Sequence, residues 1–430
     1  MASQIVSLWH SLPHSWDHDT RVPVYSFVFQ GQLYHFFLMS VVGWIELLLL
    51  ISVTACLAAL LSPLLYKYIV KQQGSVVSYV VCYVVVIPVL LLSPYPTFQI
   101  LNIRNHIFRF CLGILLPITC LFKTTAVTHG FCPDYAKTSK KAFAYFYACP
   151  MLMERDHKLD KFVPATISDL LSNLKVFLVG LLHTGILITF FQFIPEIIPP
   201  LATGPLPPDS DWYDWKPLLD PRKWWLRNLL FGIFFQCLLT VFGEGMRLAQ
   251  SLVTGYKTNI LMDNPILSAR SPSQFWGSKW NLVIHDVLKI GVYLPLRKQV
   301  SKPLAMLGTF VASGLFHEAL LWIFLYPLDD AHRCFSDPVA TATKVECYKP
   351  RLFTTTIFFM HQAFLVGIEY SRIGQLAIWK KVPDVLATLS TVTLGAVFGH
   401  FFVEPYWNSL GLESCMILIN LVRPDKGAHI

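Results

Sequence analysis

A histidine set inside an apolar run is the first residue of this sequence that points to chemistry. His317 lies in the stretch Ser-Gly-Leu-Phe-His-Glu at residues 313–318, within a segment that is otherwise hydrophobic. An ionisable side chain in such a segment is costly to place and is a functional candidate by default. Burial disfavours the charged imidazolium, so we expect a neutral ring that can accept a proton and act as a general base. A hydrogen-bonded core histidine is the alternative that the residues leave open.

A polar, tryptophan-rich segment upstream supplies the second set of candidates. Residues 275–281 are Phe-Trp-Gly-Ser-Lys-Trp-Asn, and the residues that follow have helical periodicity. A helix over 281–290 places Asn281, His285 and Lys289 on one stripe, with Asp286 beside them and apolar residues on the other face. Such an amphipathic helix either lies at the membrane surface or lines a protein cavity with its polar face. The sequence leaves both arrangements open.

The helix face around His317 also carries small residues. Ser313 and Gly314 share this face with Phe310 and leave room for a ligand or a neighbouring helix. Glu318 directly follows the histidine and therefore points about 100° away on a helix of 3.6 residues per turn. We do not expect it to bond the imidazole as a triad acid would.

Composition indicates the class of protein that must position these residues. Of the 430 residues, 54% are hydrophobic and only 14% are charged, which excludes a soluble globular protein. Several stretches reach the roughly 20 apolar residues that a membrane-crossing helix needs. The net charge of +8 comes from Lys and Arg in loops between these stretches, where membrane orientation explains it better than nucleic-acid binding. The ten cysteines lack the spacing of zinc sites, and we predict no metal.

The predicted fold is all-α, a polytopic transmembrane bundle of about eight spans, with a range of seven to ten, enclosing a tunnel. A polar N-terminal segment, 1–35, precedes a single transmembrane domain over 36–430, whose catalytic region is about 260–325. The eight spans are expected within residues 36–65, 75–92, 107–121, 170–193, 225–253, 304–326, 353–370 and 382–402.

Charge in the loops predicts the orientation. The basic segments 123–168, 258–302 and 372–381 are separated by two spans each, so all three can be cytoplasmic. The acid-rich loops 194–223 and 328–349 are then lumenal. The second of these contains Cys334 and Cys347, and the sequence leaves open whether they form a disulfide.

The Trp-rich segment ending in Asn281, followed by the apolar run with His317, resembles the membrane-bound O-acyltransferase superfamily, specifically its wax synthase-like branch. In that family an aromatic-Trp motif that ends in Trp-Asn and a later histidine flank a tunnel in which an acyl group passes from coenzyme A to a hydroxyl. The resemblance is strongest over about residues 260–325. It implies that His317 and Asn281 are the catalytic pair. The segment differs from the arginine-rich version usual in plant wax synthases, which leaves the choice of acceptor alcohol and acyl chain open.

The resemblance also implies roles for the surrounding residues. His317 would deprotonate the acceptor hydroxyl, and Asn281 would orient the reacting groups or the imidazole. Trp276 and Trp280 would enclose the pantetheine arm, and Lys279 would meet the phosphates of coenzyme A, together with Lys289 and Arg270. Anchoring at the membrane interface is an equally good explanation for these Trp and Lys residues. The substrate-binding residues that we predict are Trp276, Trp280, Lys279, Ser313 and His285.

The function expected from these observations is that of a multi-pass endoplasmic-reticulum acyltransferase that forms wax esters from acyl-CoA and a long-chain fatty alcohol. Its partners are membrane lipids, acyl-CoA as co-substrate and a hydrophobic alcohol, with no further cofactor and an open oligomeric state. A sterol or diacylglycerol acceptor, and an acetyl-CoA-dependent O-acetyltransferase of a small natural product, share the same chemistry. A proton-coupled transporter with His317 and Glu318 as relay, or a membrane scaffold without chemistry, would represent other classes.

Overall fold

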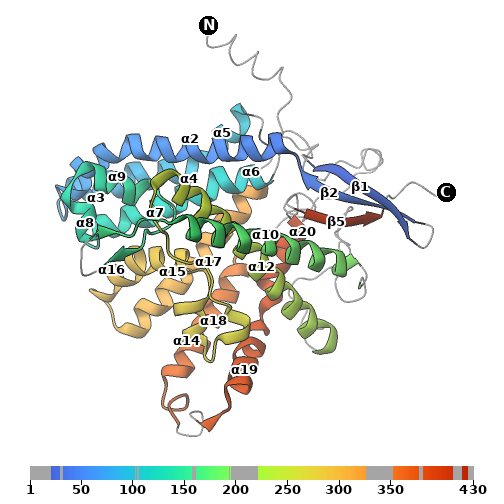
Figure 1. Cartoon of the computed structure of the whole chain (residues 1–430). Coiled ribbons are helices and arrows are strands. Elements are labelled where there is room, and N and C mark those ends of the chain that lie inside the picture. Colours follow the sequence, from blue (N-terminus) through green and yellow to red (C-terminus); the bar gives the residue numbers. More distant parts are fainter. Residues whose placement is uncertain are drawn as a thin grey trace, which may run out of the picture.

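The computed structural model describes residues 21–29, 32–101, 103, 106–156, 161–192, 194, 221–325, 352–376, 381–409 and 419–424. Helices dominate this part of the chain, and two small antiparallel sheets complete it (Figure 1). The polytopic helical class predicted from the sequence is therefore confirmed. Cys334, Cys347 and most of the two acid-rich loops lie outside the described residues.

The secondary structure elements follow one another with few breaks in the described ranges. The helices of the first half are α2 (Val41–Leu65), η1 (Tyr66–Val70), α3 (Val76–Val80), η2 (Val81–Val86), α4 (Ile87–Leu92), α5 (Pro94–Ile100), α6 (His106–Phe110), η3 (Cys111–Leu115), α7 (Leu116–Thr128), α8 (Asp134–Thr138), α9 (Lys140–Ala148) and α10 (Ile167–Gln192). Those of the second half are α12 (Pro221–Thr254), α13 (Pro265–Ser268), α14 (Pro272–Gln274), η4 (Phe275–Lys279), α15 (Leu282–Leu288), η5 (Lys289–Tyr293), α16 (Leu294–Arg297), α17 (Lys302–Leu325), α18 (Thr354–Tyr370), α19 (Asp384–Ala396) and α20 (Gly399–Ser409). Elements labelled η are π-helical turns.

Six helical stretches among the described residues are long and apolar enough to cross a membrane. They are Val41–Val70, Val76–Ile100, Phe108–Thr128, Ile167–Phe191, Trp225–Thr254 and Lys302–Ile323. Each corresponds to one of the first six predicted spans. The seventh predicted span forms the 17-residue helix α18, and the eighth is divided into α19 and α20.

The break between α19 and α20 has a visible cause in side-chain hydrogen bonds. Gln362 Nε2 donates to the carbonyl oxygen of Gly395 at 3.0 Å, and Asn228 Nδ2 donates to that of Ala396 at 2.9 Å. Carbonyl groups at a helix end need such partners wherever water is excluded. These two amides therefore allow the helix to stop inside the bundle.

The strands are the main departure from the all-helical expectation. β1 (Arg21–Phe29) and β2 (Gln32–Met39) pair antiparallel, and β5 (Ile419–Pro424) adds to β2. The end of β2 occupies residues that we predicted as the start of the first span. That span begins instead at Val41, because Ser40 caps the helix by accepting a hydrogen bond from the Gly43 amide at 3.0 Å. A second pair, β3 (Arg155–Asp156) and β4 (Lys161–Phe162), lies in the polar region after α9.

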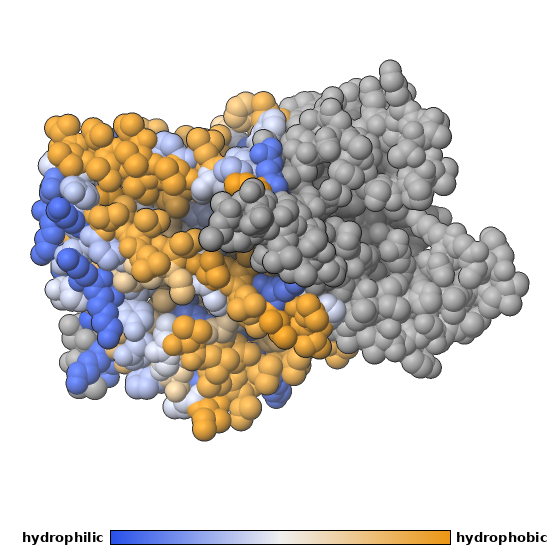
Figure 2. Space-filling model, turned by 90° about the horizontal axis from the view of Figure 1, so that it is seen from above, coloured by the Kyte–Doolittle hydropathy of each residue, from blue (hydrophilic) through white to orange (hydrophobic). Residues whose placement is uncertain are grey.

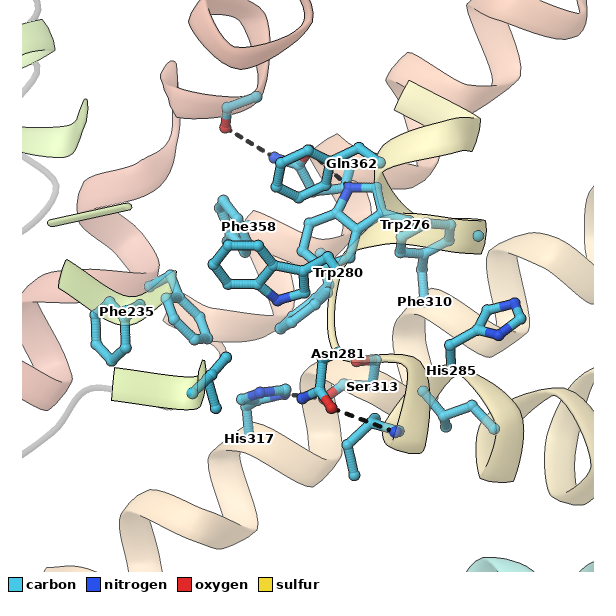
Figure 3. A pocket seen from close by; sticks show the side chains of 18 of the residues that line it. Phe235, Trp276, Trp280, Asn281, His285, Phe310, Ser313, His317, Phe358 and Gln362 are labelled. Atoms are coloured by element: carbon cyan, nitrogen blue, oxygen red, sulfur yellow. Dashed lines mark hydrogen bonds between the residues drawn. The ribbon is translucent and has the colours of Figure 1, made fainter. Parts of the chain in front are cut away.

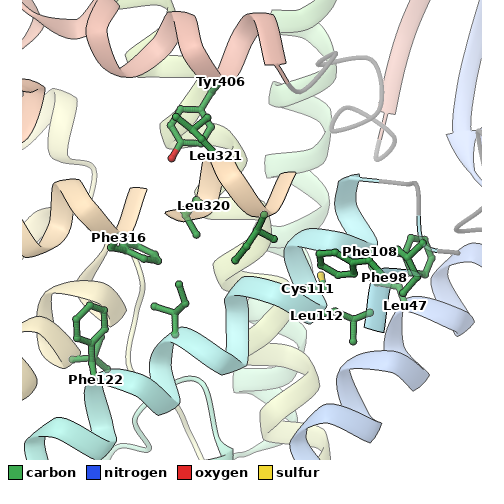
Figure 4. Packing of buried hydrophobic residues seen from close by; sticks show 14 of the residues in the cluster. Leu47, Phe98, Phe108, Cys111, Leu112, Phe122, Phe316, Leu320, Leu321 and Tyr406 are labelled. Atoms are coloured by element: carbon green, nitrogen blue, oxygen red, sulfur yellow. The ribbon is translucent and has the colours of Figure 1, made fainter. Parts of the chain in front are cut away.

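Apolar side chains cover much of the face shown in Figure 2, and hydrophilic ones gather along one edge. Exposed leucines and valines occur along α2 and α10, as expected for helices that face lipid. The interior contains a cluster of buried residues that joins α7 to α17 (Figure 4). Phe122 and Phe316 meet there edge to face, with ring centroids 6.1 Å apart.

Helix α17, which carries His317, packs against α6, α15, α18 and α20. Its approach to α18 is very close at Gly314, where an added Cβ would lie 2.6 Å from the Cα of Thr356. Near Gly314, the buried Glu318 carboxylate accepts hydrogen bonds from the Thr355 hydroxyl and the Thr356 amide. An anionic side chain at a helix N-terminus satisfies free amides and opposes the helix dipole favourably. Glycine and glutamate together fix α17 against α18.

Candidate active site

A cavity of about 540 Å³ lies between α12, α15, α17, α18, α19 and α20. Six of the seven predicted site residues line this cavity (Figure 3). They lie in the Trp-rich segment, in α15 and in α17. These six are Trp276, Trp280, Asn281, His285, Ser313 and His317. The cavity is therefore the candidate active site, and the aromatic and aliphatic side chains between these residues make it suitable for an apolar ligand.

The geometry of His317 defines which ring nitrogen is available. Its Nδ1 lies 2.7 Å from the carbonyl oxygen of Ser313, one turn earlier in α17. A carbonyl oxygen only accepts, so Nδ1 carries the proton, and Nε2 of the neutral ring keeps its lone pair. The ring packs against Phe316, Phe359 and Phe402, with centroids 4.8, 4.6 and 5.3 Å away. This aromatic enclosure holds the ring in one orientation.

Asn281 combines a structural and a chemical position. It adopts the left-handed conformation, with φ 42° and ψ 62°, which asparagine tolerates better than most residues. Its Oδ1 caps α15 by accepting from the Ile284 amide at 3.4 Å. The cap uses the side-chain oxygen, so the side-chain NH₂ group can donate a hydrogen bond to a ligand in the cavity. Figure 3 shows the Asn281 side chain pointing toward His317.

The predicted helix after Asn281 forms as α15 and continues into η5. His285 and Lys289 both line the cavity, together with the apolar Ile284 and Leu288. This helix therefore lines the cavity. His285 lies apart from His317 (Figure 3), and its Nδ1 is 3.1 Å from Asp286 Oδ1.

The two tryptophans form part of the cavity wall. Trp276 Nε1 donates to Gln362 Oε1 at 3.2 Å, and its ring contacts Phe310 and Phe359 edge to face or tilted. Trp280 stacks on Phe275 with centroids 5.2 Å apart and planes 17° apart. Trp276 lies in the π-helical turn η4, a rare geometry that often occurs at functional sites, and Trp280 directly follows this turn.

Lys279 is the predicted site residue that the structure does not bring to the cavity. Its Nζ pairs with Asp263, which precedes α13. Arg270 pairs with Asp384 at 2.8 Å on the exposed surface. The lysines that line the cavity are Lys289 and Lys302, and Nζ of Lys302 lies 4.8 Å from the ring centroid of Tyr370. A role of Lys279 in binding substrate stays a prediction.

Several cavity residues were not identified from the sequence. Gln362 is the clearest, because a glutamine in the middle of an apolar helix is itself a signal that sequence reasoning could have used. Phe359 and Phe402 carry no such signal, since aromatic residues are common in membrane helices. Glu318 bonds to α18, in agreement with the expectation that it does not contact the imidazole. Among the described residues, no three His, Cys, Asp or Glu side chains are grouped so that they could hold a metal ion.

Comparison with known proteins supports the motif assignment. Residues 260–340 match the model of the family described as membrane bound O-acyl transferase. A probable long-chain-alcohol O-fatty-acyltransferase 9 of Arabidopsis thaliana is 35% identical over 177 residues, which cover 39% of this chain and 45% of that relative. The resemblance to the wax synthase-like branch is therefore confirmed.

Shorter matches widen the range of acceptors among the relatives. The long-chain-alcohol O-fatty-acyltransferase of Simmondsia chinensis is 37% identical over 62 residues, which cover 13% of this chain and 18% of the relative. An acyl-CoA–sterol O-acyltransferase 1 of Arabidopsis thaliana is 39% identical over 61 residues, with the same two coverages. The aligned segments thus span less than half the length of these relatives.

Proposed function

We propose that this chain is a multi-pass membrane enzyme that transfers an acyl group from acyl-CoA to the hydroxyl group of an apolar alcohol. The observation that carries the proposal is that His317 and Asn281 line one cavity, and that the bond to Ser313 occupies Nδ1 of the histidine and leaves the basic Nε2 for the acceptor hydroxyl. The matched relatives named as O-acyltransferases support the same reaction class.

The reaction follows from what these two side chains can do. His317 Nε2 takes the proton of the acceptor hydroxyl while the alcohol oxygen attacks the thioester carbonyl carbon. The Asn281 NH₂ group donates a hydrogen bond to the carbonyl oxygen as negative charge develops on it. The C–S bond then breaks, and the imidazolium returns its proton to the departing thiolate. An ester and free coenzyme A result.

Charge along the cavity supports an acyl-CoA substrate. Lys302 opens α17, and His317 follows fifteen residues later, or about 22 Å along the helix at 1.5 Å per residue. Both residues line the cavity, and Lys289 provides a second cation. Phosphate groups held by the lysines would leave an extended pantetheine arm to run past the aromatic walls toward His317. The helical rise thus separates the Lys302 end of the cavity from the base by about 22 Å.

The proposed acceptor is a long-chain fatty alcohol, with wax ester as the product. The cavity walls are mainly aromatic and aliphatic, and the relative matched over the longest segment is named for a long-chain alcohol. A sterol acceptor is the second candidate, because a relative named as a sterol acyltransferase matches the chain as well. We place the enzyme in the endoplasmic reticulum membrane.

The transporter alternative loses support from the position of Glu318. A relay through His317 and Glu318 needs the two side chains to exchange protons, but the glutamate carboxylate is turned to Thr355 and Thr356 of α18. The histidine instead faces Asn281 and the aromatic residues (Figure 3).

The test is acyl transfer from labelled long-chain acyl-CoA in membranes that contain the chain, offered fatty alcohol, sterol, diacylglycerol and a small phenolic alcohol together. We expect labelled wax ester from the wild type and none from His317→Ala at equal expression. If labelled sterol ester forms instead of wax ester, the acceptor is a sterol and not a fatty alcohol. If no ester forms from long-chain acyl-CoA, and none forms when acetyl-CoA is the acyl donor, the proposed reaction is refuted.

A further inference from the structure

We propose that Glu369, near the end of α18, is a positioning residue for the transfer site, a role that rests on the proposed function. Its carboxylate accepts two hydrogen bonds from Ser273, which lies two residues before the Trp-rich segment. The Ser273 amide donates to Oε2 at 2.7 Å, and the Ser273 hydroxyl donates to Oε1. Hydrogen bonds to an ionised acceptor are the strong ones, and two of them from one residue restrict its orientation as well as its distance.

Ser273 transmits this hold because its surroundings are locally rigid. Ser271 caps α14 by accepting from the Gln274 amide at 3.2 Å, and Pro272 follows at the first helical position. The Gln274 side chain accepts from the Arg270 amide at 2.7 Å, which closes the turn. Helix α14 passes into η4 without a break, so a shift of Ser273 moves the residues that follow it.

A second contact lies two turns earlier on the same face of α18. Gln362 precedes Glu369 by seven residues, and residues at that spacing lie on one side of a helix. Its Oε1 accepts from Trp276 Nε1, three residues beyond Ser273. Two attachment points fix both the place and the rotation of the segment on α18, and the segment ends at Asn281.

Helix α18 thereby holds both halves of the candidate site. Through Glu369 and Gln362 it holds the segment that carries Asn281, and through Phe359 it packs against the ring of His317 at 4.6 Å. Loss of the Glu369 contacts would leave α17 in place and release only the asparagine side. The expected consequence is a loss of catalytic geometry with substrate binding largely retained.

The other charged contacts of the segment cannot replace Glu369. The pair of Arg270 with Asp384 is exposed, with 60% and 65% of the two side chains accessible, and exposed pairs contribute little. The pair of Lys279 with Asp263 joins the Trp-rich segment to the stretch before α13 and does not reach α18. Glu369 is thus the charged contact that connects this segment to α18 in the described part of the chain.

The first experiment measures kcat and KM for both substrates with purified wild type, Glu369→Ala, Glu369→Gln and Ser273→Ala. We expect Glu369→Ala to lower kcat by about 10- to 100-fold, because a misplacement of about 1 Å can have an effect of the larger size. The KM for acyl-CoA should change much less. Glu369→Gln, which keeps an acceptor oxygen, should recover part of the loss. Asp384→Asn is the matched control and should leave kcat unchanged.

A double variant distinguishes this role from general loss of stability. Ser273→Ala combined with Glu369→Ala should be no slower than Glu369→Ala alone, since Ser273→Ala removes only the hydroxyl bond to Glu369, which Glu369→Ala has already removed. Equal kcat per folded molecule in Glu369→Ala and wild type would overturn the proposal. So would independent, multiplying losses in the double variant.

Hydrogen exchange tests the same contact without any reaction. In Glu369→Ala, amides of residues 273–281 should exchange faster, while those of α17 should be unchanged. Unchanged exchange over 273–281 would overturn the inference even if ester formation is normal. If the wild type makes no ester, the proposed function is refuted but the role of Glu369 is not. The exchange result would still decide whether Glu369 holds the segment.

Discussion

Replacing Gly314 by alanine tests the packing that brings His317 to its place. A Cβ at this position would lie 2.6 Å from the Cα of Thr356 and 3.0 Å from its Cβ and Oγ1. The nearest atom belongs to the backbone of α18, so it cannot rotate away as a side chain can. Helices α17 and α18 must move apart to accept the methyl group.

The expected stability change is modest and the activity change is large. Overpacking costs about 1–3 kcal/mol. Alanine in place of glycine returns about 1 kcal/mol through helix propensity, so the free energy of unfolding should fall by no more than about 2 kcal/mol. His317 lies one turn further along α17, and a displacement near 1 Å there is expected to lower ester formation by about 10²-fold.

Gly367→Ala is the matched control in the same pair of helices. No heavy atom lies within 4 Å of a Cβ built at Gly367, so this variant should keep full activity and equal or slightly higher stability. The assay combines thermal unfolding of purified protein in detergent with the rate of ester formation per folded molecule. Wild-type activity in Gly314→Ala would refute the argument that close helix packing positions the histidine.

Three further changes test separate parts of the site. Asn281→Gly keeps the left-handed backbone and should lower the stability by only a few tenths of a kcal/mol through the lost helix cap. We expect a folded protein that forms no ester, which would assign the chemistry to the side-chain amide. Full activity in the ester assay would remove Asn281 from the mechanism. Lys302→Ala should raise the KM for acyl-CoA by about 10-fold, the size expected for one lost hydrogen bond to a charged group, and by less in high salt. Lys279→Ala should leave this KM unchanged, because Lys279 is paired with Asp263. Glu318→Leu removes the acceptor for two α18 groups and should lower the free energy of unfolding, measured by thermal melting, by about 1–3 kcal/mol; unchanged melting would show that the contact is not stabilising.

The sequence allowed prediction of the residues closest to the chemistry. His317 stands out because an imidazole in an apolar run needs a reason, and Asn281 follows from the motif that precedes it. Five more predicted residues come from the same region, and all but Lys279 line the cavity. The sequence could not predict that Lys302 lines the cavity and Lys279 does not, because both are lysines. The side chain of Lys279 is directed away by its ion pair with Asp263, a contact that the sequence does not reveal.

What the sequence could not provide came from contacts between distant segments. The eighth predicted span is predominantly apolar, and we predicted no break in it after Ala396. The partners of the broken end are Asn228 and Gln362 on other helices. The β-hairpin was missed for a related reason, because the hydrophobic residues at the end of β2 run directly into α2 and were counted with it.

The central claim is that His317 is the base of an acyl transfer. The most direct measurement is the rate of ester formation in a single turnover, with purified wild type and His317→Ala, at acyl-CoA concentrations that saturate both. The account predicts a rate lower by about 10²- to 10⁴-fold in the variant, with acyl-CoA still bound. An undiminished rate in folded His317→Ala would contradict it.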